Sequence, residues 1–179
     1  ARSNESKSIG LKMGEPIFKK RDLVTRHNIH LFSSNFALYG DISKRVFDIV
    51  AKNVPSYEIY SIDEAFLDFT GIKDPYNYAL HLRDKVRRWT GIPISIGISY
   101  TKTLSKVAGH IAKKSEDGVC VLNNRGRIDK ILSSLPVDEI WGVGMRYAMK
   151  LKKYDIHTAK DLRPCDESWV RKMMNVVGL

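Results

Sequence analysis

Two adjacent carboxylates, Asp63 and Glu64, lie inside a segment that is otherwise rich in aromatic and branched residues, YSIDEAFLD at positions 60–68. An unpaired carboxylate is very costly to bury, and a bound divalent cation reverses the sign of that cost. Ligands that are all oxygen favour Mg²⁺ over zinc. The pair therefore predicts a magnesium site or, as the alternative, ion pairs at the edge of a sheet.

The predicted metal site places a condition on the backbone at these two residues. Strict alternation along a strand would point Asp63 and Glu64 to opposite faces. They can share one ion only if the chain bends there, for instance at a tight hairpin or at the end of a strand. Asp68, further along, is expected to act as a structural cap or ion-pair partner.

Hydrophobic spacing predicts the elements that must position these residues. A helix is expected over residues 41–54 with Asp41 as its N-cap, and another over residues 75–90, stopped by Gly91. The other predicted elements are strands over 57–70, 92–100 and 118–122, and helices over 103–114 and 127–135. This order predicts an α/β fold with a mixed sheet and helices on one face, followed by a helical region from residue 123.

Composition restricts the partners of the 179-residue chain. Its formal charge of +10 and pI of about 9.6 favour an anionic partner such as nucleic acid. A basic membrane-surface protein would share this charge, but no run approaches the roughly 18 apolar residues of a membrane span, and no signal peptide is visible. The two cysteines, Cys120 and Cys165, lack metal-ligand spacing, which suits a reducing cytoplasm.

Several separated motifs resemble one enzyme family. SIDEAF at 61–66, IGISYTKTLSK at 96–106 and AKK at 112–114 resemble the palm of a Y-family (translesion) DNA polymerase. Residues 11–16 and 135–144 resemble the UmuC-like branch in particular. Several motifs in the family's order are far more specific than any single one.

The resemblance implies an α+β palm with a mixed sheet and a small helical thumb that carries a helix-hairpin-helix motif. Residues 1–35 would be the C-terminal part of the fingers, 36–122 an incomplete palm and 123–179 the thumb. The family has a palm strand with a metal-binding Asp and an aromatic steric gate before this point, and a little-finger domain after the thumb. We therefore expect the chain to be a fragment that is inactive alone.

The resemblance also implies roles for individual residues at the reaction centre. Asp63 and Glu64 would be the catalytic ligands of two Mg²⁺ ions beside the primer terminus. Lys113 matches a lysine that holds the incoming deoxynucleoside triphosphate. Asn4 and Lys7 stand where the family has a Tyr and an Arg for the same task, and a lysine binds phosphate as a point charge rather than as a fork.

A third group of residues is predicted to bind DNA. Gly142 and Gly144 would let the backbone approach a phosphate, with amides of the next helix as donors, although a plain helix-helix turn is the alternative. The family usually has Gly where Asp155 stands, which predicts strain or a different cap in the following turn. The lysines predicted to face the DNA backbone, for which a solvated surface is the alternative, are Lys102, Lys106, Lys150 and Lys153.

The expected activity of the intact protein is Mg²⁺-dependent, template-directed addition of deoxynucleotides to a primer during DNA damage bypass, in DNA repair and the SOS response. Its expected partners are primer-template DNA and accessory proteins such as a sliding clamp or a recombinase filament, with no membrane partner. The expected location is the cytoplasm, at the nucleoid. The alternatives are a non-enzymatic helix-hairpin-helix DNA-binding module and another palm-type phosphoryl-transfer enzyme such as a nucleotide cyclase. A thumb argues against a cyclase because a small nucleotide needs no duplex-gripping arm.

Overall fold

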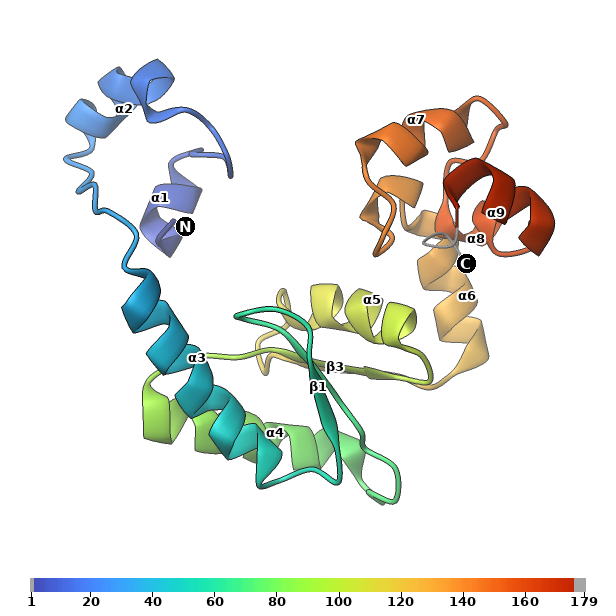
Figure 1. Cartoon of the computed structure of the whole chain (residues 1–179), viewed down its shortest axis with the longest axis horizontal. Helices are drawn as coiled ribbons and strands as arrows, with labels where there is room; N and C mark the ends of the chain where they lie inside the picture. The colour runs from blue at the N-terminus through green and yellow to red at the C-terminus, as the bar shows by residue number, and fades with distance from the viewer. Residues whose placement is uncertain (1, 176–179) are drawn as a thin grey trace. The chain divides into compact units, whose positions relative to one another are not determined.

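The computed structural model describes residues 2–175, and the chain forms two compact units, Ala1–Leu38 and Tyr39–Leu179. The first unit contains the short helices α1 (Asn4–Ser8) and α2 (Arg21–Arg26) and a 3-10 helix, η1 (Ile17–Lys20) (Figure 1). Ser3 caps α1 by accepting a hydrogen bond from the backbone N–H of Ser6.

Helix α3 (Phe36–Ala51) begins earlier than the sequence pattern predicts. Asn35 Oδ1 accepts a hydrogen bond from the backbone N–H of Leu38 at 3.0 Å, which is how an N-cap side chain starts a helix. Asp41 therefore lies inside the helix, where its carboxylate pairs with Arg45 at 2.8 Å, one turn on. The prediction of Asp41 as the N-cap was wrong because a better-placed cap precedes it.

Four short strands form two pairs in the described part of the chain. β1 (Tyr57–Ile59) and β2 (Ala65–Leu67) are antiparallel, with Glu58 opposite Phe66. β3 (Ile96–Ser99) and β4 (Val119–Leu122) are parallel, with Ile96 opposite Val119. The strand predicted over residues 57–70 is thus two strands joined by a bend, and both pairing directions of a mixed α/β fold are present.

The connecting helices start and end at residues with clear capping chemistry. Asp74 caps α4 (Pro75–Thr90), whose proline stands at the first turn where its missing N–H costs nothing. Gly91 ends this helix at φ +75°, as predicted. Thr101 caps α5 (Lys102–Ala112) by accepting from the N–H of Leu104.

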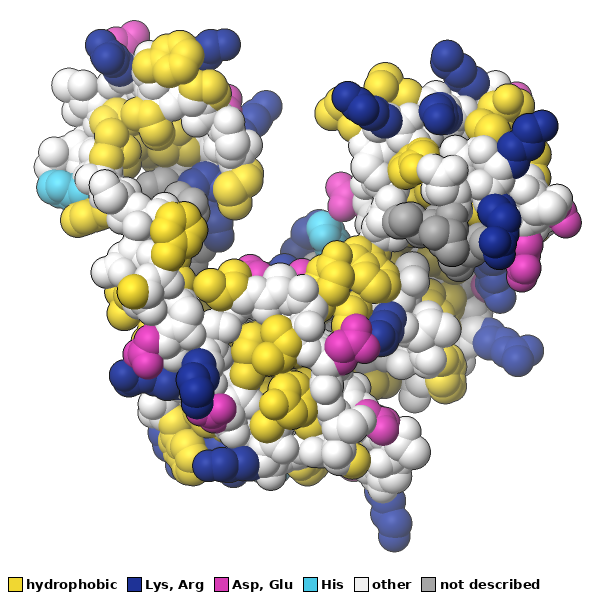
Figure 2. Space-filling model, in the orientation of Figure 1, with side chains coloured by type: hydrophobic (Ala, Val, Ile, Leu, Met, Phe, Trp, Pro, Cys, Tyr) yellow, Lys and Arg dark blue, Asp and Glu magenta, His cyan; other side chains and the backbone are white. Residues whose placement is uncertain are grey.

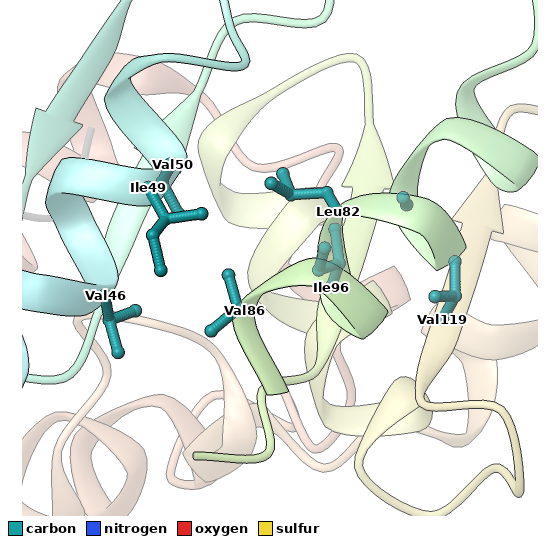
Figure 3. Close-up of a cluster of buried hydrophobic side chains, with 8 residues drawn as sticks. Val46, Ile49, Val50, Leu82, Val86, Ile96 and Val119 are labelled. Carbon is teal, nitrogen blue, oxygen red and sulfur yellow. The ribbon is translucent and has the colours of Figure 1, made fainter. Parts of the chain in front are cut away.

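Helices cover both faces of the β3–β4 pair, which corrects the expectation of helices on one face. On one face, side chains of α3 and α4 pack with Ile96 and Val119 (Figure 3). On the other face, α5 and α6 (Arg125–Ser134) pack with Cys120 and Leu122, and Figure 1 shows α4 and α5 on opposite sides of β3. A strand buried on both faces lacks the polar alternation that would have revealed the second layer.

Gly97 makes the close packing of α5 possible. A Cβ added there would lie 2.0 Å from the backbone nitrogen of Gly109 and 2.5 Å from backbone atoms of Ala108 and Ser105. No side chain fits at that distance, so the α5 backbone rests directly on β3.

The C-terminal part of the second unit is helical and has its own hydrophobic cluster. Its elements after α6 are η2 (Val137–Glu139), α7 (Met145–Lys152), α8 (Ala159–Leu162) and α9 (Glu167–Met174). Val137, Leu151 and Met174 are almost fully buried in this cluster. Among the described residues, no helix has the length and apolar character needed to cross a bilayer.

Candidate active site

The bend between β1 and β2 carries the two adjacent carboxylates. The backbone N–H groups of Tyr60 and Ser61 both donate to the carbonyl oxygen of Glu64, at 2.9 and 3.0 Å. Ser43, on α3, donates its hydroxyl to the carbonyl of Ile62. The backbone therefore bends at Asp63 and Glu64. Such a bend is the condition under which two adjacent carboxylates can share one site.

Asp63 and Glu64 have different surroundings. Asp63 is exposed and accepts a hydrogen bond from the Ser61 hydroxyl at 2.7 Å. In residues 2–175, no Lys, Arg or His forms an ion pair with it. Glu64 is half-buried and pairs with Lys106 Nζ at 2.7 Å. The ion-pair alternative thus describes Glu64 and leaves the Asp63 carboxylate open to a cation.

Two lysines predicted to touch DNA lie beside this hairpin on α5. Lys106 pairs with Glu64, and Lys102 pairs with Glu58 at 2.5 Å. Both positive charges are offset by carboxylates, so a DNA phosphate would have to compete for them. Their contact with DNA stays a prediction.

The residue chemistry of the bend suits Mg²⁺. Asp63 and Glu64 offer oxygen ligands only, and proteins commonly hold Mg²⁺ through one or two carboxylates together with substrate phosphates. Within residues 2–175, no group of three or more His, Cys, Asp and Glu residues is close enough to hold an ion. The remaining ligands would then come from the substrate, water or other residues.

The predicted triphosphate ligands fall in both units. In the first unit, Lys7 Nζ donates to Asn4 Oδ1 at 3.2 Å, so these two residues lie together on α1. In the second unit, Lys113 is exposed at the C-terminal cap of α5. A cation at a helix C-terminus is favourable in itself, which is the structural alternative for Lys113.

The turn before α7 carries Gly142 and Gly144, the two glycines predicted to let the backbone approach a phosphate. Gly142 adopts φ +89°, a conformation that favours glycine. Gly144 is the N-cap of α7 and makes no side-chain cap, and a Cβ there would meet nothing within 4 Å. Val143, between them, is buried and fixes the turn to the helical core. Gly144, Met145 and Arg146 are exposed, so a phosphate contact at the start of α7 stays a prediction.

The lysines of α7 lie at the far end of that helix. Lys150 stacks over the Tyr147 ring at 5.7 Å, and Lys153 caps the C-terminus. At about 1.5 Å per residue, the nine steps from Gly144 to Lys153 span roughly 13 Å along the helix axis. Figure 2 shows Lys and Arg side chains over α7 and α9, so the basic surface extends beyond a single phosphate-binding point.

Asp155 adopts φ +58°, the left-handed conformation that favours glycine. An aspartate tolerates this conformation better than most residues, and its backbone N–H bonds the carbonyl of Lys152 at 3.3 Å. The predicted strain is therefore local and is partly offset.

Sequence reasoning assigned no role to Ser61, Glu58 or Trp141. Ser61 orients Asp63 and Glu58 neutralises Lys102. The indole Nε1 of Trp141 donates to the Tyr60 hydroxyl at 3.1 Å. Ser61 stands two residues before Asp63, which is the spacing of a local side-chain turn. The hydrogen bond between them could therefore have been predicted from the sequence. The partners of Glu58 and Trp141 are distant in the chain and left no such signal.

Solved structures share the fold of this chain. The structure matches a solved insertion ternary complex of Dbh DNA polymerase over 96% of this chain and 50% of that one, with a TM-score of 0.80 and 23% identity. This likeness defines the fold and bears out the predicted α/β class.

Sequence relatives identify the family within that class. UmuC of Salmonella typhimurium is 42% identical over 181 residues, which cover 98% of this chain and 43% of UmuC. DNA polymerase IV 1 of Halalkalibacterium halodurans is 32% identical over 179 residues, covering 98% of this chain and 42% of that protein. The impB/mucB/samB family model matches residues 1–110, and the chain belongs to this family. The predicted resemblance to UmuC-like Y-family polymerases is confirmed, and neither alternative is favoured.

Proposed function

We propose that the full-length protein containing this chain is a translesion DNA polymerase that adds deoxynucleotides to a primer as a template directs. The observation that carries the proposal is the β1–β2 bend, which presents Asp63 and Glu64 together in a member of this family. Residues 1–35, 36–122 and 123–179 would act as fingers, palm and thumb. The accessory partners, the nucleoid location and the SOS role stay predictions.

Asp63 and Glu64 would hold Mg²⁺, which when bound supplies charge stabilisation for the attacking 3′-hydroxyl and the leaving pyrophosphate. The Ser61 hydroxyl holds the Asp63 carboxylate in one orientation, and Lys106 does the same for Glu64. Because these carboxylates are already oriented, less free energy is spent on reorganising the site during the reaction.

Asn4, Lys7 and Lys113 would bind the incoming triphosphate. Lys7 already contacts Asn4, so the α1 pair would present one ammonium group and one amide to the phosphates. The turn at Gly142 and Gly144 would grip the DNA backbone without reading its sequence.

Primer extension by the full-length protein tests the proposal. With Mg²⁺, a primed template and the four deoxynucleotides, we expect incorporation of the complementary nucleotide and continued synthesis across an abasic site. Duplex binding without extension would support the non-enzymatic module instead. A cyclic nucleotide formed without primer would support a cyclase.

Lys7→Ala and Lys113→Ala should each lower kcat/KM for the incoming nucleotide by about tenfold, the effect of losing one charge-assisted hydrogen bond. Affinity for primer-template should stay unchanged. Lys114→Ala is the matched control for Lys113 because it is the adjacent exposed lysine. An equal loss of duplex affinity would assign Lys7 or Lys113 to the DNA backbone.

Binding of duplex DNA by the 179-residue chain should be weak, independent of sequence and steeply dependent on salt, with a slope of about −0.9 per phosphate neutralised. Gly144→Val should weaken binding, since the open space at this N-cap lets a side chain fit while blocking the phosphate. Lys153→Ala should flatten the slope by up to about one unit.

A salt titration with Lys130→Ala as control separates these effects, because Lys130 is an exposed lysine of α6 with no predicted DNA contact. Unchanged affinity in a folded Gly144→Val variant would remove the turn from the DNA-binding surface.

A further inference from the structure

Three aromatic side chains meet beside the bend of the hairpin: two come from the hairpin itself and one, Trp141, from the turn before α7. Trp141 lies edge-on to Tyr60, with ring centroids 5.3 Å apart and an interplanar angle of 84°. It also contacts Phe66 of β2 at 5.3 Å, and Phe66 contacts Tyr60 at 5.8 Å. The hydrogen bond from Trp141 Nε1 to the Tyr60 hydroxyl fixes the relative orientation of the two rings.

Tyr60 is in direct contact with the surroundings of Glu64. Its backbone N–H donates to the Glu64 carbonyl at 2.9 Å. Lys106 Nζ lies over its ring at 5.2 Å while pairing with the Glu64 carboxylate at 2.7 Å. A shift of the Tyr60 ring would therefore disturb both the backbone turn and the cation that holds Glu64.

Trp141 belongs to the turn that precedes α7. Gly142 follows it at φ +89°, and the N–H of Val143 closes the turn on the carbonyl of Ile140 at 2.9 Å. Because Val143 is buried in the helical core, the turn is held firmly at its other side. The indole thus connects a fixed turn to the bend that carries the carboxylates.

We infer that Trp141 is a positioning residue that couples the predicted DNA-phosphate turn to the catalytic bend. The inference rests on the proposed polymerase function. Trp141 takes no part in the chemistry: it acts through Tyr60 and Lys106 on the placement of Glu64.

Kinetics of the full-length protein test the coupling. Trp141→Ala should lower kcat by at least about tenfold, the scale expected for a displaced catalytic group, and should raise the Mg²⁺ concentration needed for half-maximal rate. Primer-template affinity should be unchanged. Trp141→Phe keeps an aromatic ring but loses the N–H donor, and it should recover part of kcat.

Trp169→Ala is the matched control. Trp169, which packs against the helical core, makes the same kind of edge-on contact with the exposed Tyr154, at 5.4 Å and 85°. It has no contact with the hairpin, so kcat and the Mg²⁺ requirement should stay within about twofold of the starting protein. Equal effects of the two substitutions on both parameters would overturn the inference.

Hydrogen exchange in the 179-residue chain gives a readout that does not require polymerase activity. The amides of Tyr60 and Ser61 should exchange at least about tenfold faster in Trp141→Ala and at an unchanged rate in Trp169→Ala. Unchanged exchange in folded Trp141→Ala would refute the coupling while leaving the polymerase proposal intact. Faster exchange in a protein that shows no primer extension would instead count against the polymerase.

Discussion

Asp63→Asn in the full-length protein is expected to lower the rate of primer extension by about 10³-fold or more. A carboxylate that holds Mg²⁺ contributes several kcal/mol of transition-state stabilisation, and each 1.4 kcal/mol is a factor of ten in rate. The amide of Asn keeps the shape but loses the charge. Because Asp63 is exposed and its carboxylate accepts a hydrogen bond from the neutral hydroxyl of Ser61, folding should be unaffected. Single-turnover incorporation measures the effect.

Glu64→Gln should reduce extension to a similar extent, but it also leaves Lys106 without its carboxylate. Its melting temperature must therefore be measured beside its activity. The matched control is Asp68→Asn in the same hairpin. Asp68 accepts hydrogen bonds from Thr70, which lower its pKa, and this structural cap should be dispensable for turnover. Near-normal extension by Asp63→Asn would show that this carboxylate is not a metal ligand.

The sequence was most informative where the chemistry restricts the backbone. Two adjacent carboxylates can serve one ion only at a bend, and the hairpin places its bend at Asp63 and Glu64. The stop of α4 at Gly91 followed from residue type in the same way. Each of these features depends on neighbours within a few positions.

Contacts between distant positions could not be predicted from local patterns. Lys106 and its partner Glu64 are 42 positions apart, and Trp141 and Tyr60 are 81 apart. Nothing in the spacing of charges or rings indicates which of many possible pairs will form. The pairing of the α5 lysines with the hairpin carboxylates therefore left no local signal, and their contact with DNA stays a prediction.

The second helical layer was missed for a related reason. A solvent-facing strand surface is predicted from alternating polar residues, and β3 carries glycine on the face that α5 covers. Glycine is neither apolar nor charged, so the pattern left that face unassigned. The α5 backbone covers this face because Gly97 has no side chain to keep it away.

Gly97→Ala should destabilise the second unit by about 3 kcal/mol, at the upper end of the usual cost of overpacking. The added methyl group would lie 2.0 Å from the Gly109 nitrogen and 2.5 Å from the Ser105 carbonyl oxygen. These are backbone atoms, which cannot rotate away as a side chain would, so α5 must move off β3. Thermal unfolding of the 179-residue chain should show a fall of roughly 10 °C in Tm.

Gly109→Ala offers a control on the other side of the same contact. Gly109 lies inside α5, and a Cβ built on it meets nothing within 4 Å. Since alanine is favoured over glycine in a helix by about 1 kcal/mol, this substitution should raise Tm slightly. The same chemical change should therefore have opposite signs at two glycines that face each other. If Gly97→Ala is as stable as the starting protein, α5 does not rest on β3 at this distance, and Lys102 and Lys106 lose the support that brings them to Glu58 and Glu64.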